Sequence, residues 1–233
     1  MRVLLSFCIT LFIVSNLSAQ SVNRISLHRE TSALIKGNKI VEQADCYYSR
    51  ENLKMVVHST SLNEYVKIVS SKGEISIYFP ESNELILQQN SYLSSKKEEL
   101  YIYVNNMYDD LGLRNEGFTM METRNDGDYM IIDWAPPASH KDKIKKIEIV
   151  YENMMPIYSA TYNFNGDVYK KTYYTDYLVN SNLILPKRIT DITYTSKTDS
   201  IVRRVLYSDI KINDEVDMTY LNYKVPKDAK LIK

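Results

Sequence analysis

Residues that could carry chemistry are few and scattered in this chain. The three histidines, His28, His58 and His140, lack any spacing typical of a metal site. No two glycines form the Gly-x-Ser-x-Gly turn of a hydrolase nucleophile, and no Gly-x-Gly pair exists to hold a dinucleotide phosphate. We therefore expect no enzyme, no metal ion and no cofactor, and we expect His58, inside a strand pattern, to be structural.

Acidic and sulfur-containing residues each allow a functional and a structural interpretation. Asp109-Asp110 and Glu98-Glu99 fall in an expected helix, where a solvated face is the commoner case. The acidic run at residues 214–217 could bind calcium, although an acidic turn before a strand is commoner. Met120-Met121 and Met154-Met155 fit an adaptable apolar lining as well as an ordinary core, and core is favoured.

The first twenty residues have the pattern of a secretory signal peptide. Arg2 precedes a short apolar run, and small and polar residues follow it up to Gln20. Cleavage after Ala19 or after Gln20 is equally consistent with the pattern, and no lipid-attachment cysteine follows the apolar run. Cys8 lies in this segment, so the remaining chain keeps only Cys46, which fits a buried small hydrophobic residue better than a nucleophile. We expect a signal peptide at residues 1–20, one domain at residues 21–233, and a periplasmic or secreted protein.

Composition excludes some partners and favours a β-rich fold. Lysine and arginine balance aspartate and glutamate at 29 each, so nothing indicates the basic face that nucleic acid requires. Tyrosine is frequent, at 20 of 233 residues, and it suits half-buried strands and apolar cavities with a wet edge.

Short runs of branched and aromatic residues separated by polar turns predict an antiparallel meander. Many of these runs alternate apolar with polar residues, which is typical of a sheet with one dry and one wet face. The expected strands lie at residues 41–49, 53–60, 64–70, 74–79, 84–89, 118–124, 129–134, 144–151, 157–163, 168–177, 183–195, 201–212 and 218–225.

The clearest helical pattern lies in the middle of the chain, at residues 94–111. Leu100, Val104, Met107 and Leu111 recur on one helical face. Ser95 with Glu98 predicts a capping box at its start, and Gly112 is a plausible stop. A second, short helix is expected near the N-terminus, around residues 25–35.

A sheet of about a dozen strands is too wide to stay flat and should curl. If its dry face is concave, one helix covers part of the resulting trough without filling it. Such a cavity could accommodate an apolar ligand.

Two stretches resemble a known family. Residues 46–55 and 71–80 are similar to the start of the periplasmic outer-membrane lipoprotein carriers, the LolA/LolB-like family, and residues 221–232 are similar to its closing strand, proline and final hydrophobic pair. The order of elements fits as well. The resemblance implies an open half-barrel, mainly β, of about 11–12 antiparallel strands, with an N-terminal helix and a central helix as a lid over an apolar cavity.

The resemblance also implies a function. A protein of this family carries lipoprotein acyl chains toward the outer membrane and exchanges them with inner- and outer-membrane partners. Its lid-locking arginine corresponds to Arg50, although Glu51 replaces the family proline, and Asp228-Ala229 replace a late glycine.

We therefore expect a monomeric carrier of lipid acyl chains. The alternative is a secreted envelope protein that binds other proteins and has a solid core without a lipid ligand. The candidate cavity residues are Tyr78, Leu100, Val104, Met107, Leu111, Met120 and Trp134.

Overall fold

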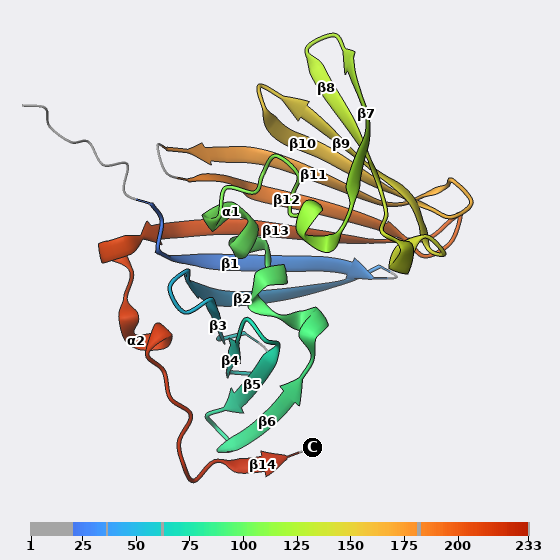
Figure 1. Cartoon of the computed structure of the whole chain (residues 1–233). Coiled ribbons are helices and arrows are strands. Elements are labelled where there is room, and N and C mark those ends of the chain that lie inside the picture. Colours follow the sequence, from blue (N-terminus) through green and yellow to red (C-terminus); the bar gives the residue numbers. More distant parts are fainter. Residues whose placement is uncertain (1–20, 36, 62, 181–182, 233) are drawn as a thin grey trace, which may run out of the picture.

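The computed structural model describes residues 21–35, 37–61, 63–180 and 183–232, so the expected signal peptide lies outside the described residues. Within these ranges, fourteen strands form one sheet (Figure 1). The strands are β1 (Arg24–Ile35), β2 (Asn38–Ser49), β3 (Lys54–Ser59), β4 (Tyr65–Val69), β5 (Glu74–Phe79), β6 (Glu84–Gln89), β7 (Thr119–Asp126), β8 (Tyr129–Ala135), β9 (Ile144–Glu152), β10 (Met155–Asn163), β11 (Val168–Val179), β12 (Ile184–Tyr194), β13 (Ser200–Ile212) and β14 (Lys230–Ile232).

The strand order is β14-β6-β5-β4-β3-β2-β1-β13-β12-β11-β10-β9-β8-β7. Two antiparallel meanders, β1–β6 and β7–β13, meet where β1 pairs with β13. The sheet is open, because β14 and β7 form separate edges, and it is mainly antiparallel, with β14 parallel to β6. The predicted curved open half-barrel is therefore confirmed, with fourteen strands in the described residues instead of eleven or twelve.

The predicted N-terminal helix is wrong. Residues 24–35 form β1, which pairs along its whole length with β2 and over most of it with β13. Ile25 and Leu27 follow the two-residue period of a strand and are buried, whereas the adjacent Leu34 and Ile35 produced the helical pattern. Pairing with both neighbours thus outweighs the local sequence preference.

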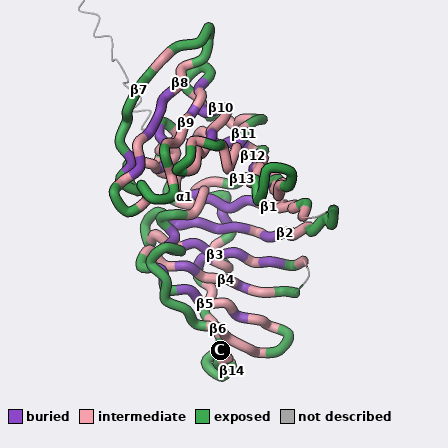
Figure 2. Tube along the Cα trace, turned by 90° about the vertical axis from the view of Figure 1, so that its right-hand side faces the viewer, coloured by how far each residue is buried: buried purple, intermediate pink, exposed green. Residues whose placement is uncertain are grey.

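The two faces of the sheet carry different coverings. Residues 91–118, which we call the lid, lie on one face, and residues 213–229, which we call the strap, lie on the other (Figure 1). Figure 2 shows the same sheet from the side, with β7 and β8 curling toward the side of the lid. We refer to the lid face and the outer face accordingly.

The lid contains fewer helical residues than the sequence predicts. It contains η1 (Ser91–Leu93), η2 (Ser95–Lys97), α1 (Glu99–Val104) and η3 (Arg114–Glu116) in place of one helix over residues 94–111. The predicted capping box is wrong, because the Ser95 hydroxyl donates to the Leu53 carbonyl and Glu98 caps α1 without a side-chain bond. Asn106 and Leu111 adopt positive φ angles, which interrupt the helical path.

Side chains occupy most of the space beneath α1. Leu100, Tyr103 and Val104 pack with Leu183 and Leu185 in one core on the lid face. A second core on this face surrounds Trp134, where the lid descends toward β7. A small pocket of about 170 Å³, whose lining includes Leu100, remains at the start of α1, and the larger apolar hollow lies elsewhere on the lid face.

The strap replaces the predicted closing strand at residues 218–225. It contains η5 (Asn213–Glu215) and α2 (Met218–Leu221) before the chain reaches β14. Tyr220 stacks on Tyr47 and His58 of the outer face, and Tyr223 lies against Tyr78. Burial of these rings on the sheet accounts for the departure from a strand.

In the described residues, no helix has the length and apolar character needed to span a bilayer.

Candidate ligand groove

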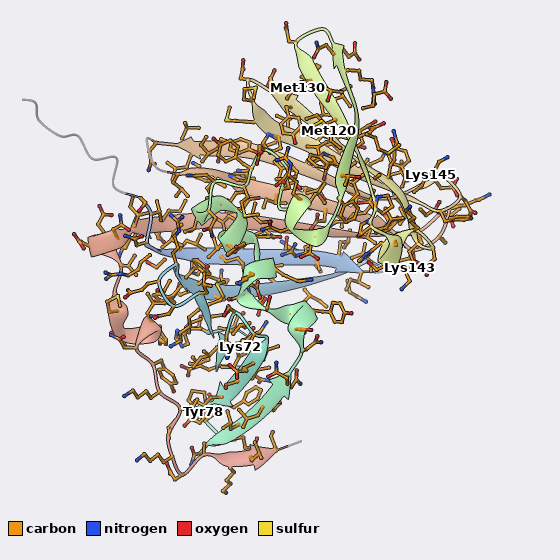
Figure 3. All side chains as sticks on the ribbon, viewed as in Figure 1. Lys72, Tyr78, Met120, Met130, Lys143 and Lys145 are labelled. Atoms are coloured by element: carbon orange, nitrogen blue, oxygen red, sulfur yellow. The ribbon has the colours of Figure 1, made fainter. Side chains whose placement is uncertain are left out.

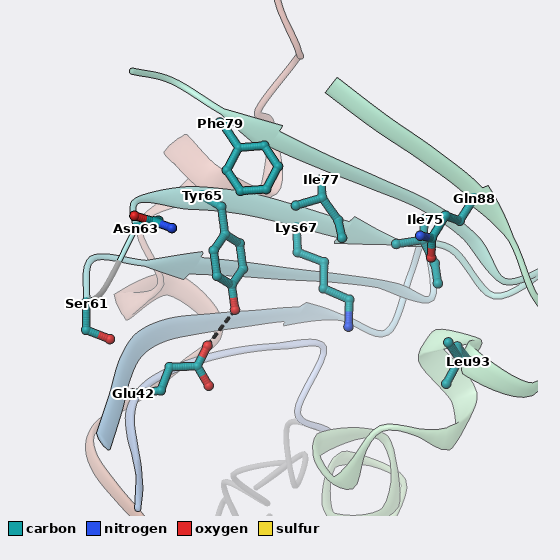
Figure 4. A pocket seen from close by; sticks show the side chains of 10 residues that line it. All are labelled: Glu42, Ser61, Asn63, Tyr65, Lys67, Ile75, Ile77, Phe79, Gln88 and Leu93. Atoms are coloured by element: carbon teal, nitrogen blue, oxygen red, sulfur yellow. Dashed lines mark hydrogen bonds between the residues drawn. The ribbon is translucent and has the colours of Figure 1, made fainter. Parts of the chain in front are cut away.

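An apolar groove lies on the lid face, over β4 to β6 (Figure 4). Its volume is about 390 Å³. Ten residues line it, namely Glu42, Ser61, Asn63, Tyr65, Lys67, Ile75, Ile77, Phe79, Gln88 and Leu93. The lid helix α1 packs on the core formed by β1–β3, β12 and β13, so the lid face over β4 to β6 remains largely uncovered.

Strand alternation builds the groove. In β5, Ile75, Ile77 and Phe79 project to the lid face, whereas Tyr78 projects to the outer face. In β4, Tyr65 and Lys67 project to the groove, and Val66 between them is buried under the strap. The floor continues into the core below α1, because Ile75 belongs to both.

A half-buried polar arrangement closes one end of the groove. The Tyr65 hydroxyl donates to Glu42 Oε1 at 2.5 Å, and Arg29 Nη2 lies 3.5 Å from Glu42 Oε2. Burial and the hydrogen bond to Glu42 raise the pKa of Tyr65 to about 12. Tyr65 is therefore a neutral hydrogen-bond donor at physiological pH, and Glu42 is already engaged.

The seven predicted cavity residues are not brought together. Leu100 and Val104 are core residues under α1, and Leu111 packs against the core around the buried Trp134. Met107 is half-buried in the lid. The remaining two lie apart in Figure 3: Tyr78 is on the outer face beside the strap, and Met120 is 49% exposed on β7.

None of the seven side chains lines the groove. The alternation in residues 74–79 was the signal that could have identified Ile75, Ile77 and Phe79. It shows which side chains share a face, but the part of that face left open depends on where the lid packs.

Arg50 occupies the turn after β2, and its side chain is exposed. Its backbone N–H donates to the Asn23 carbonyl at 2.8 Å, and in the described part of the chain its guanidinium forms no hydrogen bond or ion pair. A lid-locking role for Arg50 therefore remains a prediction.

A different group of residues attaches the lid to the sheet in this conformation. Arg203 Nη1 lies 3.4 Å from Glu99 Oε1 and 2.9 Å from Asp191 Oδ2, and the Tyr207 hydroxyl donates to Glu99. Burial alone would raise the pKa of Asp191, but Lys170, Thr172 and Arg203 hold this pKa below its usual value. Glu99 at the start of α1 is thus held by the charged Arg203 and the neutral Tyr207 hydroxyl on the sheet.

The described residues contain no cluster of three or more potential metal-ligating side chains. His28 pairs with Asp45 at 2.8 Å, and His58 pairs with Glu64 at 2.9 Å beneath the Tyr220 ring. Both pairs lie on the outer face, away from the groove. The interpretation of His58 as structural agrees with this packing.

Cys46 is fully enclosed below α1, where burial raises the pKa of its thiol to about 12. Because the thiolate is the reactive form, we expect no alkylation of Cys46 in the native protein and complete alkylation in denaturant. Mass mapping of the Cys46 peptide after iodoacetamide treatment measures this. Rapid native labelling at Cys46 would show that the core below α1 opens.

Comparisons with known proteins show similarity in fold but no similarity in sequence. No protein-family profile and no curated protein sequence matches this chain. A LolA superfamily protein from Nitrosomonas europaea superposes with a TM-score of 0.56 at 12% identity, over 86% of this chain and 91% of the other.

Two further solved structures are similar. A putative outer-membrane lipoprotein-sorting domain from Vibrio parahaemolyticus gives a TM-score of 0.57 at 9% identity, over 86% of this chain and 89% of the other. A DUF1329 family protein from Desulfovibrio piger gives 0.53 at 8% identity, over 88% and 92%. The chain therefore has a LolA-like fold, of the kind found in lipoprotein-sorting proteins.

Proposed function

We propose that this protein is a periplasmic carrier that binds lipid acyl chains in the groove over β4 to β6. The observation that carries the proposal is an open apolar groove on the lid face of a LolA-like fold. Transfer of lipids or lipoproteins toward the outer membrane, with membrane partners that load and unload the carrier, belongs to this proposal.

The size of the groove favours a modest cargo. Its volume of about 390 Å³ lies at the small end of ligand pockets, which span about 300–1,000 Å³. Each buried methylene contributes about 0.8 kcal/mol, whereas association costs at least about 4 kcal/mol. A single chain of a dozen or so carbons therefore leaves a favourable balance of binding free energy.

The lining supports binding without a reaction. It contains no histidine or cysteine, and its one carboxylate, Glu42, already accepts from Tyr65 and faces Arg29. No nucleophile–base pair is present among the ten lining residues.

A matched pair of substitutions tests the proposal. Ile77→Ser removes apolar surface from the groove, and we expect it to weaken acyl binding about tenfold. Leu87→Ser on β6 removes similar surface from the outer face, where Leu87 is 57% exposed, and should leave binding unchanged. Displacement of the neutral dye N-phenyl-1-naphthylamine by 1-dodecanol measures both.

The proposal predicts displacement by the native protein together with co-purified lipid in native mass spectrometry. Failure of the dye and dodecanol to bind would overturn it. Equal binding by the Ile77→Ser and native proteins would place any acyl site elsewhere. The alternative, a protein-binding module with a solid core and no lipid ligand, gains only from the failure to bind.

A further inference from the structure

Lys67 is a charged residue in the otherwise apolar middle of the groove. It lies on β4, with Tyr65 two residues before it and Ile77 opposite it on β5. Its side chain is half-buried and extends across the groove floor (Figure 4). Among the described residues, its ammonium group forms no hydrogen bond and no ion pair.

The nearest candidate for a counterion is already committed. Glu42 is the only carboxylate among the ten lining residues, and it accepts from Tyr65 and pairs with Arg29. Arg29 itself projects below the lid and does not line the groove. The Glu42 charge is thus balanced by Arg29, and Lys67 leaves the groove with one uncompensated positive charge.

A half-buried cation without a counterion, beside apolar side chains, favours a ligand that brings a group of opposite charge. Resting on the acyl-carrier function proposed above, we propose that the groove selects single-chain amphiphiles with an anionic head. The carboxylate or phosphate of the ligand binds the Lys67 ammonium, and the tail lies along Ile75, Ile77 and Phe79. A fatty acid and a lysophospholipid share this chemistry.

Three ligands of equal chain length separate the contribution of the head group to binding from that of the tail. Dodecanoate and dodecyl phosphate carry the two anionic heads, and 1-dodecanol carries none. We expect the native protein to bind the anions about tenfold more tightly than the alcohol, as measured by displacement of N-phenyl-1-naphthylamine at low salt. The more tightly bound of the two anions identifies the head group, and added salt should reduce the preference.

Substitution of the lysine tests its role. Lys67→Met keeps the aliphatic volume and removes the charge, so we expect the preference for the anions over 1-dodecanol to disappear. Lys67→Arg should retain the preference. Lys171→Met is the matched control, because Lys171 is also half-buried but lies on the outer face over the Tyr194 ring, and it should behave as the native protein.

The outcomes distinguish this inference from the proposed function. Equal affinity of the native protein for the alcohol and the anions, or an unchanged preference in Lys67→Met, overturns the anionic-head inference and leaves the acyl site standing. Absence of binding by all three ligands overturns both. Loss of 1-dodecanol binding in Lys67→Met would show that the residue acts through groove shape and would also overturn the inference.

Discussion

Replacing Trp134 with alanine should cost about 3–5 kcal/mol of unfolding free energy, the range for a large aromatic side chain removed from a core. Trp134 is fully buried on β8, and it packs with Phe118, Ile149 and Tyr151. The Arg114 guanidinium of the lid lies 5.1 Å from the ring centroid. The substitution therefore removes a contact between lid and sheet as well as core volume. Urea unfolding followed by far-ultraviolet circular dichroism measures the loss.

Two further variants test why the loss of Trp134 destabilises the protein. The Trp134 indole N–H has no hydrogen-bond partner in the described structure, so Trp134→Phe loses no hydrogen bond and should cost less than about 1.5 kcal/mol. Met120→Ala alters the half-exposed cross-strand neighbour and should change stability by about 0.5 kcal/mol or less. A loss below about 1 kcal/mol in Trp134→Ala would contradict the view that this core holds the β7–β9 part of the sheet.

Local alternation was sufficient to predict most of the strands. The expected strand at residues 144–151 corresponds to β9 (Ile144–Glu152), and that at residues 168–177 corresponds to β11 (Val168–Val179). The Asp-Gly signal also placed the β7–β8 hairpin, in which Asp126 pairs with Tyr129. These features depend on residues close in sequence, and so the pattern contains them.

Features set by distant contacts could not be predicted in this way. β1 is a strand because β13 arrives beside it from the far end of the chain. Residues 218–225 are rich in apolar and aromatic residues, as a strand would be, but the rings of Tyr220 and Tyr223 pack on the outer face and hold a strap. In each case tertiary packing decides between two local structures that the sequence permits.

The candidate site shows the same limit. The sequence predicts an apolar face for both β5 and α1, but it does not show which part of the sheet the lid covers. Because α1 ends at Val104 and packs over β12, the larger apolar hollow lies over β4 to β6, and only a smaller pocket lies at the start of the helix. Lys67 lines an open groove only because the lid packs on another part of the sheet.

Gly73→Ala should destabilise the protein by about 2–5 kcal/mol and also weaken binding in the groove. Gly73 has a φ of +78°, and a Cβ there would lie 2.1 Å from the Asn90 carbonyl oxygen and 2.9 Å from the Ser91 Cα. The strained backbone costs about 1–2 kcal/mol and overpacking about 1–3 kcal/mol. The Asn90 N–H donates to the Gly73 carbonyl at 2.8 Å, so relief of the clash must displace the start of the lid, including the groove wall at Leu93.

Gly37→Ala provides the matched control, because Gly37 has a φ of +81° but no atom within 4 Å of the added Cβ. It should show only the backbone cost of about 1–2 kcal/mol and normal displacement of N-phenyl-1-naphthylamine by 1-dodecanol. The difference between the two alanine variants in urea unfolding therefore measures the close approach of turn and lid. If both variants lose the same free energy and bind equally well, the turn at Gly73 does not position the lid, and the groove wall must be held by the contacts of Ser95 with Ser70 and Leu53 instead.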